Sequence, residues 1–159
     1  TSSAGRLFDA VAALEGLCPE VSYEGEAAAR LEALADPAAG RPYEFSWEEG
    51  PGPWVIATAP ILRGVVADRV TGVPLARVSG RFHATLAELF AEICLALQRK
   101  TGLGRVALSG GVFQNATLLR GLTAGLARRG LRGLTHGQVP PNDGGLSLGQ
   151  ALAAAALKE

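Results

Sequence analysis

The feature that most constrains the fold is a change of pattern near residue 104. From there the chain predicts a strand, a helix, a weaker strand and an Ala-rich helix, over Arg105–Leu108, Ala116–Arg129, Leu131–Leu134 and Gly144–Lys158. Two strands joined through a helix pair in parallel, because such a crossover returns the chain to the same end of the sheet. The order therefore predicts an α/β fold for residues 104–159.

Residues 1–103 are expected to be mainly helical, with a short strand region. Helices are predicted after Ser2 or Ser3 as N-cap, over Glu24–Ala35, after Thr58 with Pro60 in its first turn, and over Leu75–Lys100. Pro42–Trp47 alternates aromatic and polar residues, which is typical of a half-exposed strand. We interpret this part as a helical insertion before the α/β part, within a single domain of residues 1–159.

Composition excludes several classes of function. The 159 residues are 48% hydrophobic, which is enough for one domain with a core. The formal net charge is zero, so the chain lacks the excess of basic residues typical of nucleic-acid-binding proteins. No apolar run reaches the roughly 20 residues that span a bilayer. The two cysteines, Cys18 and Cys94, are far apart, so reduced thiols in a cytoplasmic protein are expected, with Cys94 on a helical core face.

The segment Leu108–Asn115 (LSGGVFQN) is the first candidate for chemistry. A strand ends in Ser109-Gly110-Gly111, and the next helix begins near Asn115. Glycines allow close approach of a ligand to the backbone, and a helix N-terminus offers unpaired N–H groups to an anion. The segment suits a nucleotide, although the spacing alone slightly favours a tight turn with Asn115 as N-cap, serving only the fold.

The second candidate is Asp143, which follows two prolines and an asparagine and precedes the last helix. Its carboxylate is suited either to cap that helix or to ligate a metal or Mg-nucleotide at the same sheet edge as Asn115. One Asp does not make a metal site, so other ligands would have to come from elsewhere.

The two histidines have less specific surroundings. His83 lies beside the apolar stripe of the long helix, which favours a solvent-facing or interdomain position. His136 precedes the Pro-Pro loop and is within reach of the edge that carries Asp143, although a structural or solvated role is favoured for it. A Ser-His-Asp hydrolase is weakly supported, because Ser109 lacks the GxSxG elbow.

Four segments together resemble the HypF carbamoyltransferases of hydrogenase maturation: TSSAGRLFDA, VSYEGEA, LSGGVFQN and VPPNDGGLSLGQ, in the same order. The tRNA threonylcarbamoyltransferases carry a similar GGVxxN turn followed by a metal-ligating Asp, at the interval that separates Asn115 from Asp143. The Phe-Gln and Pro-Pro variants favour HypF. Antibiotic O-carbamoyltransferases share the architecture and stay an alternative.

This resemblance implies the C-terminal lobe of an actin-like ATPase (ASKHA) fold, with ATP or carbamoyl-adenylate held between two lobes. By motif match, Ser109, Gly110, Gly111 and Asn115 would bind the nucleotide, and Asp143 would ligate one divalent metal, iron or zinc. In the family two histidines of the first lobe complete the metal site. No segment here matches that first lobe, which is therefore an expected partner.

The family's chemistry implies the function. Carbamoyl phosphate and ATP would give carbamoyl-adenylate, and the carbamoyl group would pass to the C-terminal cysteine of a hydrogenase-maturation partner protein. This chain alone is expected not to catalyse, and its catalytic residues are unknown. A non-catalytic module of the same fold, which binds a partner through the small residues of the last helix, stays an alternative.

Overall fold

The computed structural model describes residues 3–157. Its helices are α1 (Ala4–Leu14), α2 (Glu26–Ala33), α3 (Ala59–Val70), α4 (Leu75–Thr101), α5 (Ala116–Arg128) and α6 (Leu146–Ala156). Its strands are β1 (Ser46–Glu48), β2 (Val55–Ala57), β3 (Arg105–Ala107) and β4 (Arg132–Leu134). Two 3-10 turns, η1 (Gly111–Gln114) and η2 (Asp143–Gly145), precede the last two helices.

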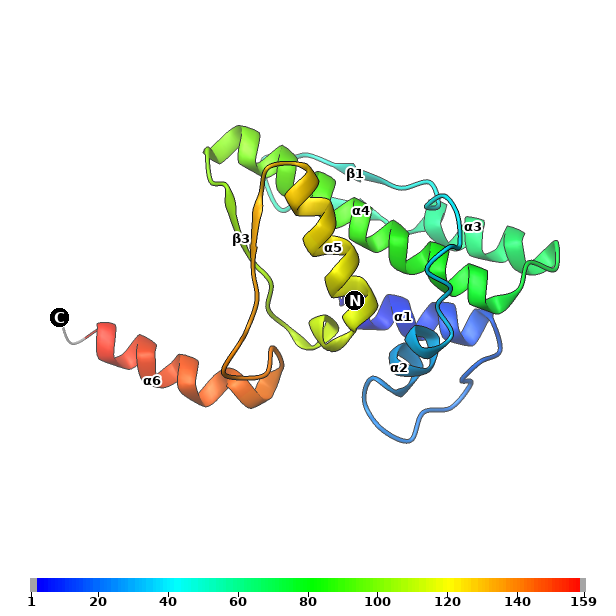
Figure 1. The fold of residues 1–159 in the computed structure, drawn as a ribbon, viewed down its shortest axis with the longest axis horizontal. Helices are drawn as coiled ribbons and strands as arrows, with labels where there is room; N and C mark the ends of the chain where they lie inside the picture. Colours follow the sequence, from blue (N-terminus) through cyan, green and yellow to red (C-terminus); the bar gives the residue numbers. More distant parts are fainter. Residues whose placement is uncertain (1–2, 158–159) are drawn as a thin grey trace.

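The long helix α4 is the centre of the fold. It follows Pro74 and ends at Thr101, where the C-cap Gly102 has a φ of +74° and donates its N–H to Gln98 O. Helices α5, α3 and α2 pack against it, as Figure 1 shows. The predicted helix Leu75–Lys100 is confirmed to within one residue.

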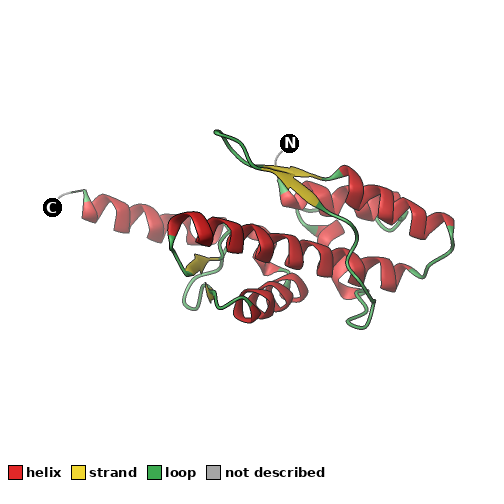
Figure 2. Cartoon of the chain, turned by 90° about the horizontal axis from the view of Figure 1, so that it is seen from above, coloured by secondary structure: helices red, strands yellow, loops and turns green. Residues whose placement is uncertain are grey.

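The predicted parallel strand pair is also confirmed. Strands β3 and β4 pair in parallel, with Arg105 opposite Arg132 and Ala107 opposite Leu134, and α5 forms the crossover. Figure 2 shows this pair well apart from the β1–β2 hairpin. Both short strands end at the same edge, where the loops that carry the candidate site residues begin.

One hydrophobic core joins most of the elements. Its fully buried side chains come from α1, α2, α3, α4 and α5, and include Phe8, Leu31, Ile61, Phe82 and Leu122. Helix α6 contributes none of its residues to it, and Figure 1 shows that helix projecting from the body as an arm.

Several predictions of local structure were incomplete. The strand expected over Pro42–Trp47 is the shorter β1, and its partner β2 was not predicted; the two form an antiparallel hairpin around the Gly-Pro-Gly-Pro turn. The helix expected over Glu24–Ala35 is the shorter α2. Thr58 occupies the N-cap position of α3 without a side-chain capping hydrogen bond. Ser3 stands at the N-cap position of α1, while Ser2 and the predicted helix end at Lys158 lie outside the described residues.

Both cysteines are free thiols. Cys18 is buried, and Cys94 is half-buried on α4, packed against the core as predicted. Within residues 3–157, none of the helices combines the length and the hydropathy needed to cross a bilayer.

Candidate functional site

The two candidate loops meet at the carboxyl edge of the β3–β4 pair. The backbone N–H of Gly110, after β3, donates to Pro141 O, after β4, over 2.7 Å. Ser109 Oγ and His136 Nε2 lie 3.1 Å apart across the same junction. The prediction that the Ser-Gly-Gly turn and the Asp143 loop share one sheet edge is therefore confirmed.

The turn after β3 depends on glycine. Gly110 has φ +111° and ψ 155°, a conformation that residues with a Cβ rarely adopt. A Cβ placed there would meet no other atom within 4 Å, so the requirement comes from the backbone and not from crowding. Ser109, Gly110 and Gly111 are all exposed, so a ligand can approach this turn, although the N–H and C=O of Gly110 are already bonded to Pro141 O and Phe113 N–H.

Asn115 is the N-cap of α5. Its Oδ1 accepts the N–H of Leu118 at 2.8 Å, and its Nδ2 lies 2.9 Å from His83 Nε2. The side chain is only 7% exposed. The capping role is thus realised, and one Nδ2 hydrogen and one Oδ1 lone pair are left for any further partner.

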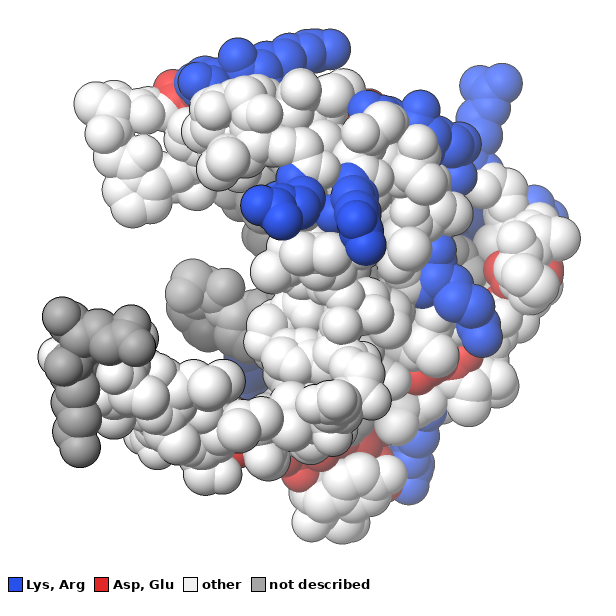
Figure 3. All heavy atoms as spheres, turned by 60° about the vertical axis from the view of Figure 1, so that its left-hand side comes forward, with Lys and Arg blue, Asp and Glu red and all other residues white. Residues whose placement is uncertain are grey.

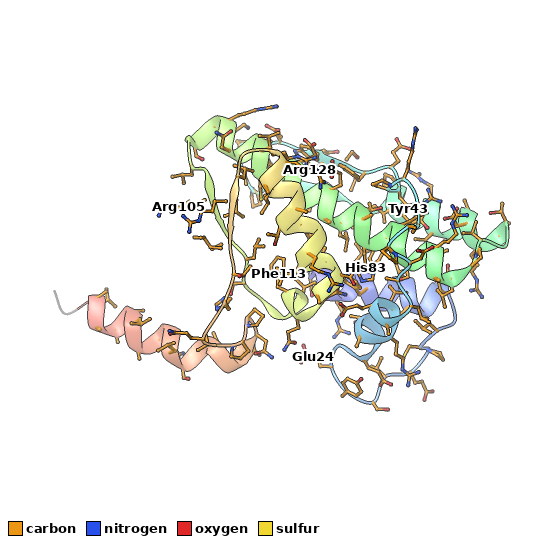
Figure 4. All side chains as sticks on the ribbon, viewed as in Figure 1. Glu24, Tyr43, His83, Arg105, Phe113 and Arg128 are labelled. Carbon is orange, nitrogen blue, oxygen red and sulfur yellow. The ribbon has the colours of Figure 1, made fainter. Side chains whose placement is uncertain are left out.

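His83 corrects the prediction from the helical stripe. Expected at a solvent-facing or interdomain position, it is 2% exposed, on the side of α4 that meets the start of α5. Figure 4 shows its side chain in the interior near α1. The cause is that α4 is buried on more than the face marked by its apolar stripe, because α5 and α2 also pack against it. A face of small residues, Gly80, Ala84 and Ala87, was the available signal for this second contact.

Asp143 is not a cap, and this alternative was wrong. It is the first residue of η2, whose N-cap is Asn142, with Oδ1 accepting the N–H of Gly144 at 3.1 Å. The Asp143 carboxylate is exposed and makes no hydrogen bond or ion pair with the described residues. It is therefore available as a single oxygen ligand to a cation.

The described residues do not complete a metal or nucleotide site. Across residues 3–157, no three His, Cys, Asp or Glu side chains gather in a metal-binding cluster. The hollow at the sheet edge, between Phe113, His136 and Pro141, holds about 90 Å³. Pockets for small molecules usually hold roughly 300–1,000 Å³, so this edge would supply one wall of a larger site.

Comparisons with known proteins identify the family. A sequence model of the family described as "Carbamoyltransferase, Kae1-like Domain, second subdomain" matches residues 1–150. The chain is 45% identical over 166 residues to the carbamoyltransferase HypF of Rhodobacter capsulatus, covering all of this chain and 20% of that protein. It is 37% identical over 176 residues to carbamoyltransferase HypF2 of Cupriavidus necator, covering 94% of this chain and 21% of that protein.

Solved structures agree with these sequence matches. A crystal structure of full-length HypF in its phosphate- and nucleotide-bound form superposes with a TM-score of 0.94 at 40% identity, covering 99% of this chain and 21% of that one. The crystal structure of T. kodakarensis HypF gives a TM-score of 0.80 at 29% identity, covering 99% of this chain and 20% of that one. The chain thus spans about a fifth of the length of the relatives it matches. These matches do not favour the antibiotic-type alternative, and the chain belongs to the HypF carbamoyltransferase family.

Proposed function

We propose that this chain is the second lobe of a HypF carbamoyltransferase of the actin-like ATPase (ASKHA) fold, and that its β3–β4 edge forms one wall of a nucleotide and metal site. The observation that carries the proposal is the hydrogen bond from Gly110 N to Pro141 O, because it joins the glycine turn and the Asp143 loop into one surface. A similar chain has been solved with phosphate and nucleotide bound, which supports the ligand class.

The residues of this edge have chemically distinct roles in the proposal. The exposed backbone at Ser109, Gly110 and Gly111 would lie against ATP or carbamoyl-adenylate, next to the start of α5, whose N-terminus favours anions. Asn115 would contact the nucleotide through the donor and acceptor positions that capping leaves free. Asp143 would supply one oxygen ligand to a divalent metal, iron or zinc.

The remaining parts of the site would come from a first lobe. An edge hollow of about 90 Å³ does not enclose a nucleotide, so both the missing wall and the missing metal ligands require further chain. When bound, the metal would polarise phosphate or carbamoyl oxygens. Closing two lobes also excludes water, which would otherwise hydrolyse a carbamoyl-adenylate.

The reaction proposed for the assembled enzyme uses carbamoyl phosphate and ATP, by way of carbamoyl-adenylate. The C-terminal cysteine thiol of a cytoplasmic partner protein in hydrogenase maturation would then take the carbamoyl group, with cleavage of the mixed anhydride and AMP as the leaving group. This chain alone would orient the nucleotide without catalysing the transfer.

Asp143→Asn in the full-length enzyme that carries this chain tests the metal role. The substitution keeps the size of the side chain and removes its charge, so metal bound per protein molecule and carbamoyl transfer should both fall at least tenfold, on the order expected for a lost ligand charge. Because Asp143 has no partner among the described residues, the melting temperature of the metal-free protein should not change.

Glu48→Gln on the exposed β1 strand is the matched control, because it removes a carboxylate far along the chain from the site. Elemental analysis of both purified variants gives the metal content. Full metal retention in Asp143→Asn would contradict the proposal, and loss of folding would instead assign Asp143 a structural role.

A further inference from the structure

A buried line of hydrogen bonds connects α2, α4 and the start of α5. Ser79 Oγ donates to Leu31 O at 2.5 Å, and His83 Nδ1 lies 2.8 Å from Ser79 O. On the other side of the ring, His83 Nε2 lies 2.9 Å from Asn115 Nδ2. Asn115 Oδ1 then accepts the N–H of Leu118. Ser79, His83 and Asn115 are all buried.

The partners determine where the proton of His83 lies. A backbone carbonyl only accepts, so Nδ1 must carry the hydrogen that points to Ser79 O. Nε2 is then an acceptor, which fits the Asn115 amide nitrogen facing it. With Nδ2 toward His83, Oδ1 faces the N–H of Leu118. A flipped amide would put oxygen against the Nε2 lone pair and nitrogen against a donor.

We propose that His83 is a positioning residue for the candidate nucleotide site: its neutral imidazole fixes the orientation of the Asn115 side-chain amide at the start of α5. The inference rests on the proposed function only in assigning Asn115 a nucleotide contact. The Phe8 ring packs against the imidazole in an edge-type arrangement, with centroids 5.3 Å apart, so the imidazole is held by packing as well as by hydrogen bonds.

The surroundings keep this histidine neutral. Burial lowers the pKa of His83 below its ordinary value of 6.5, although the Ser79 carbonyl and the Glu32 carboxylate oppose that shift. Glu32 Oε1 is itself engaged by the N–H of Thr117 at 2.9 Å. The other charged groups that face His83 are Asp36, after α2, and Arg120, on α5, which line with it a pocket of about 330 Å³. The two aromatic rings that pack against the imidazole, Phe8 from α1 and Phe82 from α4, are uncharged.

Protonation would reverse the role of Nε2. An imidazolium donates from both nitrogens, so Nε2–H would face the Asn115 amide nitrogen, and two donors do not bond. The amide would have to flip and lose its cap on α5, or move away. The orientation of Asn115 should therefore be intact above pH 6.5 and lost as the pH falls through the lowered pKa of His83.

Three variants separate positioning from general stability. His83→Gln places an amide oxygen near the former Nε2 acceptor and does not titrate in this range. His83→Phe keeps a ring and removes the acceptor. Thr85→Val, on the same helix, removes a different buried hydrogen bond, the one from Tyr43 N at 2.8 Å, and serves as the matched control.

The first measurement does not depend on nucleotide. In ¹⁵N NMR spectra of this chain, His83 Nε2 should have the shift of an unprotonated acceptor at pH 7.5. The Asn115 side-chain NH₂ signals should keep their dispersion in His83→Gln and Thr85→Val, and lose it in His83→Phe. Unchanged Asn115 signals in His83→Phe, or a protonated Nε2, would overturn the inference even if ATP binding proved absent.

The second measurement is the dissociation constant of ATP for the full-length enzyme between pH 5.5 and 8. We expect about tenfold weaker binding in His83→Phe at pH 7.5, the size of one lost hydrogen bond, and less than about twofold change in His83→Gln and Thr85→Val. Wild type should weaken at acid pH while His83→Gln should not. Equal acid loss in both, or a Thr85→Val effect equal to that of His83→Phe, would assign the change to stability and overturn the positioning role.

Discussion

At the scale of single residues, the absence of a Cβ at Gly80 allows the loop after α2 to pack closely on the central helix α4. Gly80 lies on α4 against this loop: a Cβ built on it would come within 2.0 Å of Asp36 O and 2.5 Å of Ala39 Cβ. The loop is held in place by Asp36 N, which donates to Ala76 O at 3.0 Å. The crowding involves the loop backbone and a Cβ fixed to it, and no side-chain rotation relieves it.

Gly80→Ala should accordingly lower the free energy of unfolding by about 3 kcal/mol or more, because the loop backbone has to move. Gly5→Ala, in α1, is the control, since its nearest atom is the Ser3 hydroxyl oxygen at an ordinary 3.5 Å. That change should alter stability by less than about 1 kcal/mol. Urea denaturation followed by circular dichroism measures both, and equal midpoints for Gly80→Ala and wild type would disprove the steric argument.

At the scale of elements, α5 crosses α4 at short range because small residues face each other. A Cβ on Gly121 would lie 3.1 Å from Ala87 Cβ, and one on Gly125 would lie 3.2 Å from Ala91 Cβ. Beyond this contact Arg129 pairs with Glu88 and Glu92 of α4. Since Asn115 begins α5, the crossing also determines where the candidate site lies relative to His83.

Gly121→Val tests this crossing. The added branched side chain should push α5 from Ala87 and cost about 1–3 kcal/mol of folding free energy. Ala124→Val, on the exposed face of the same helix, carries only the helix-propensity cost of a β-branched residue, at most about 0.7 kcal/mol. Equal stability of the two variants in the same urea titration would contradict a tight crossing of α5 and α4.

The sequence predicts those elements best whose own pattern is long or whose ends carry strong signals. The apolar stripe of α4 and the flanking Pro74 and Gly102 define that helix closely. By contrast, β2 has three residues directly after a Pro-containing turn, too few for a period, and it exists through its pairing with β1. Its formation is a tertiary effect that the local sequence does not encode.

Some features of the candidate site were likewise predictable from the sequence, and others were not. Parallel strands bring their carboxyl ends to one edge, so the meeting of the Ser109 and Asp143 loops was predictable. Asp143 was one candidate for the cap of the last helix, but a 3-10 turn begins at Asp143 itself, one residue before the predicted helix start, and Asn142 caps that turn. The contact between His83 and Asn115 spans 32 positions and depends on how α5 crosses α4, which no local spacing specifies.

At the scale of the whole molecule, the chain consists of a packed body and an uncovered arm. None of the residues of α6 is buried, and Leu146, Leu148 and Leu152 are 46–63% exposed. Figure 3 shows the arm as a surface without charged side chains, across an open gap from the Arg- and Lys-rich side of the body. A helix that buries none of its apolar side chains against the described residues gains its stability mainly from its own hydrogen bonds.

Helix α6 should therefore be marginal in this chain by itself. Isolated helices shorter than about 12–15 residues are weakly formed in water even when rich in alanine, and α6 has 11 residues. Amide hydrogen exchange should be fast throughout Leu146–Ala156 and slow in α4, because opening α6 exposes no core. In the full-length enzyme the same amides should become protected if the first lobe covers them. Slow exchange of α6 in this chain alone would contradict this prediction and show that other contacts, for example in a dimer, stabilise the helix. A dimer would be identified by exchange rates that depend on protein concentration.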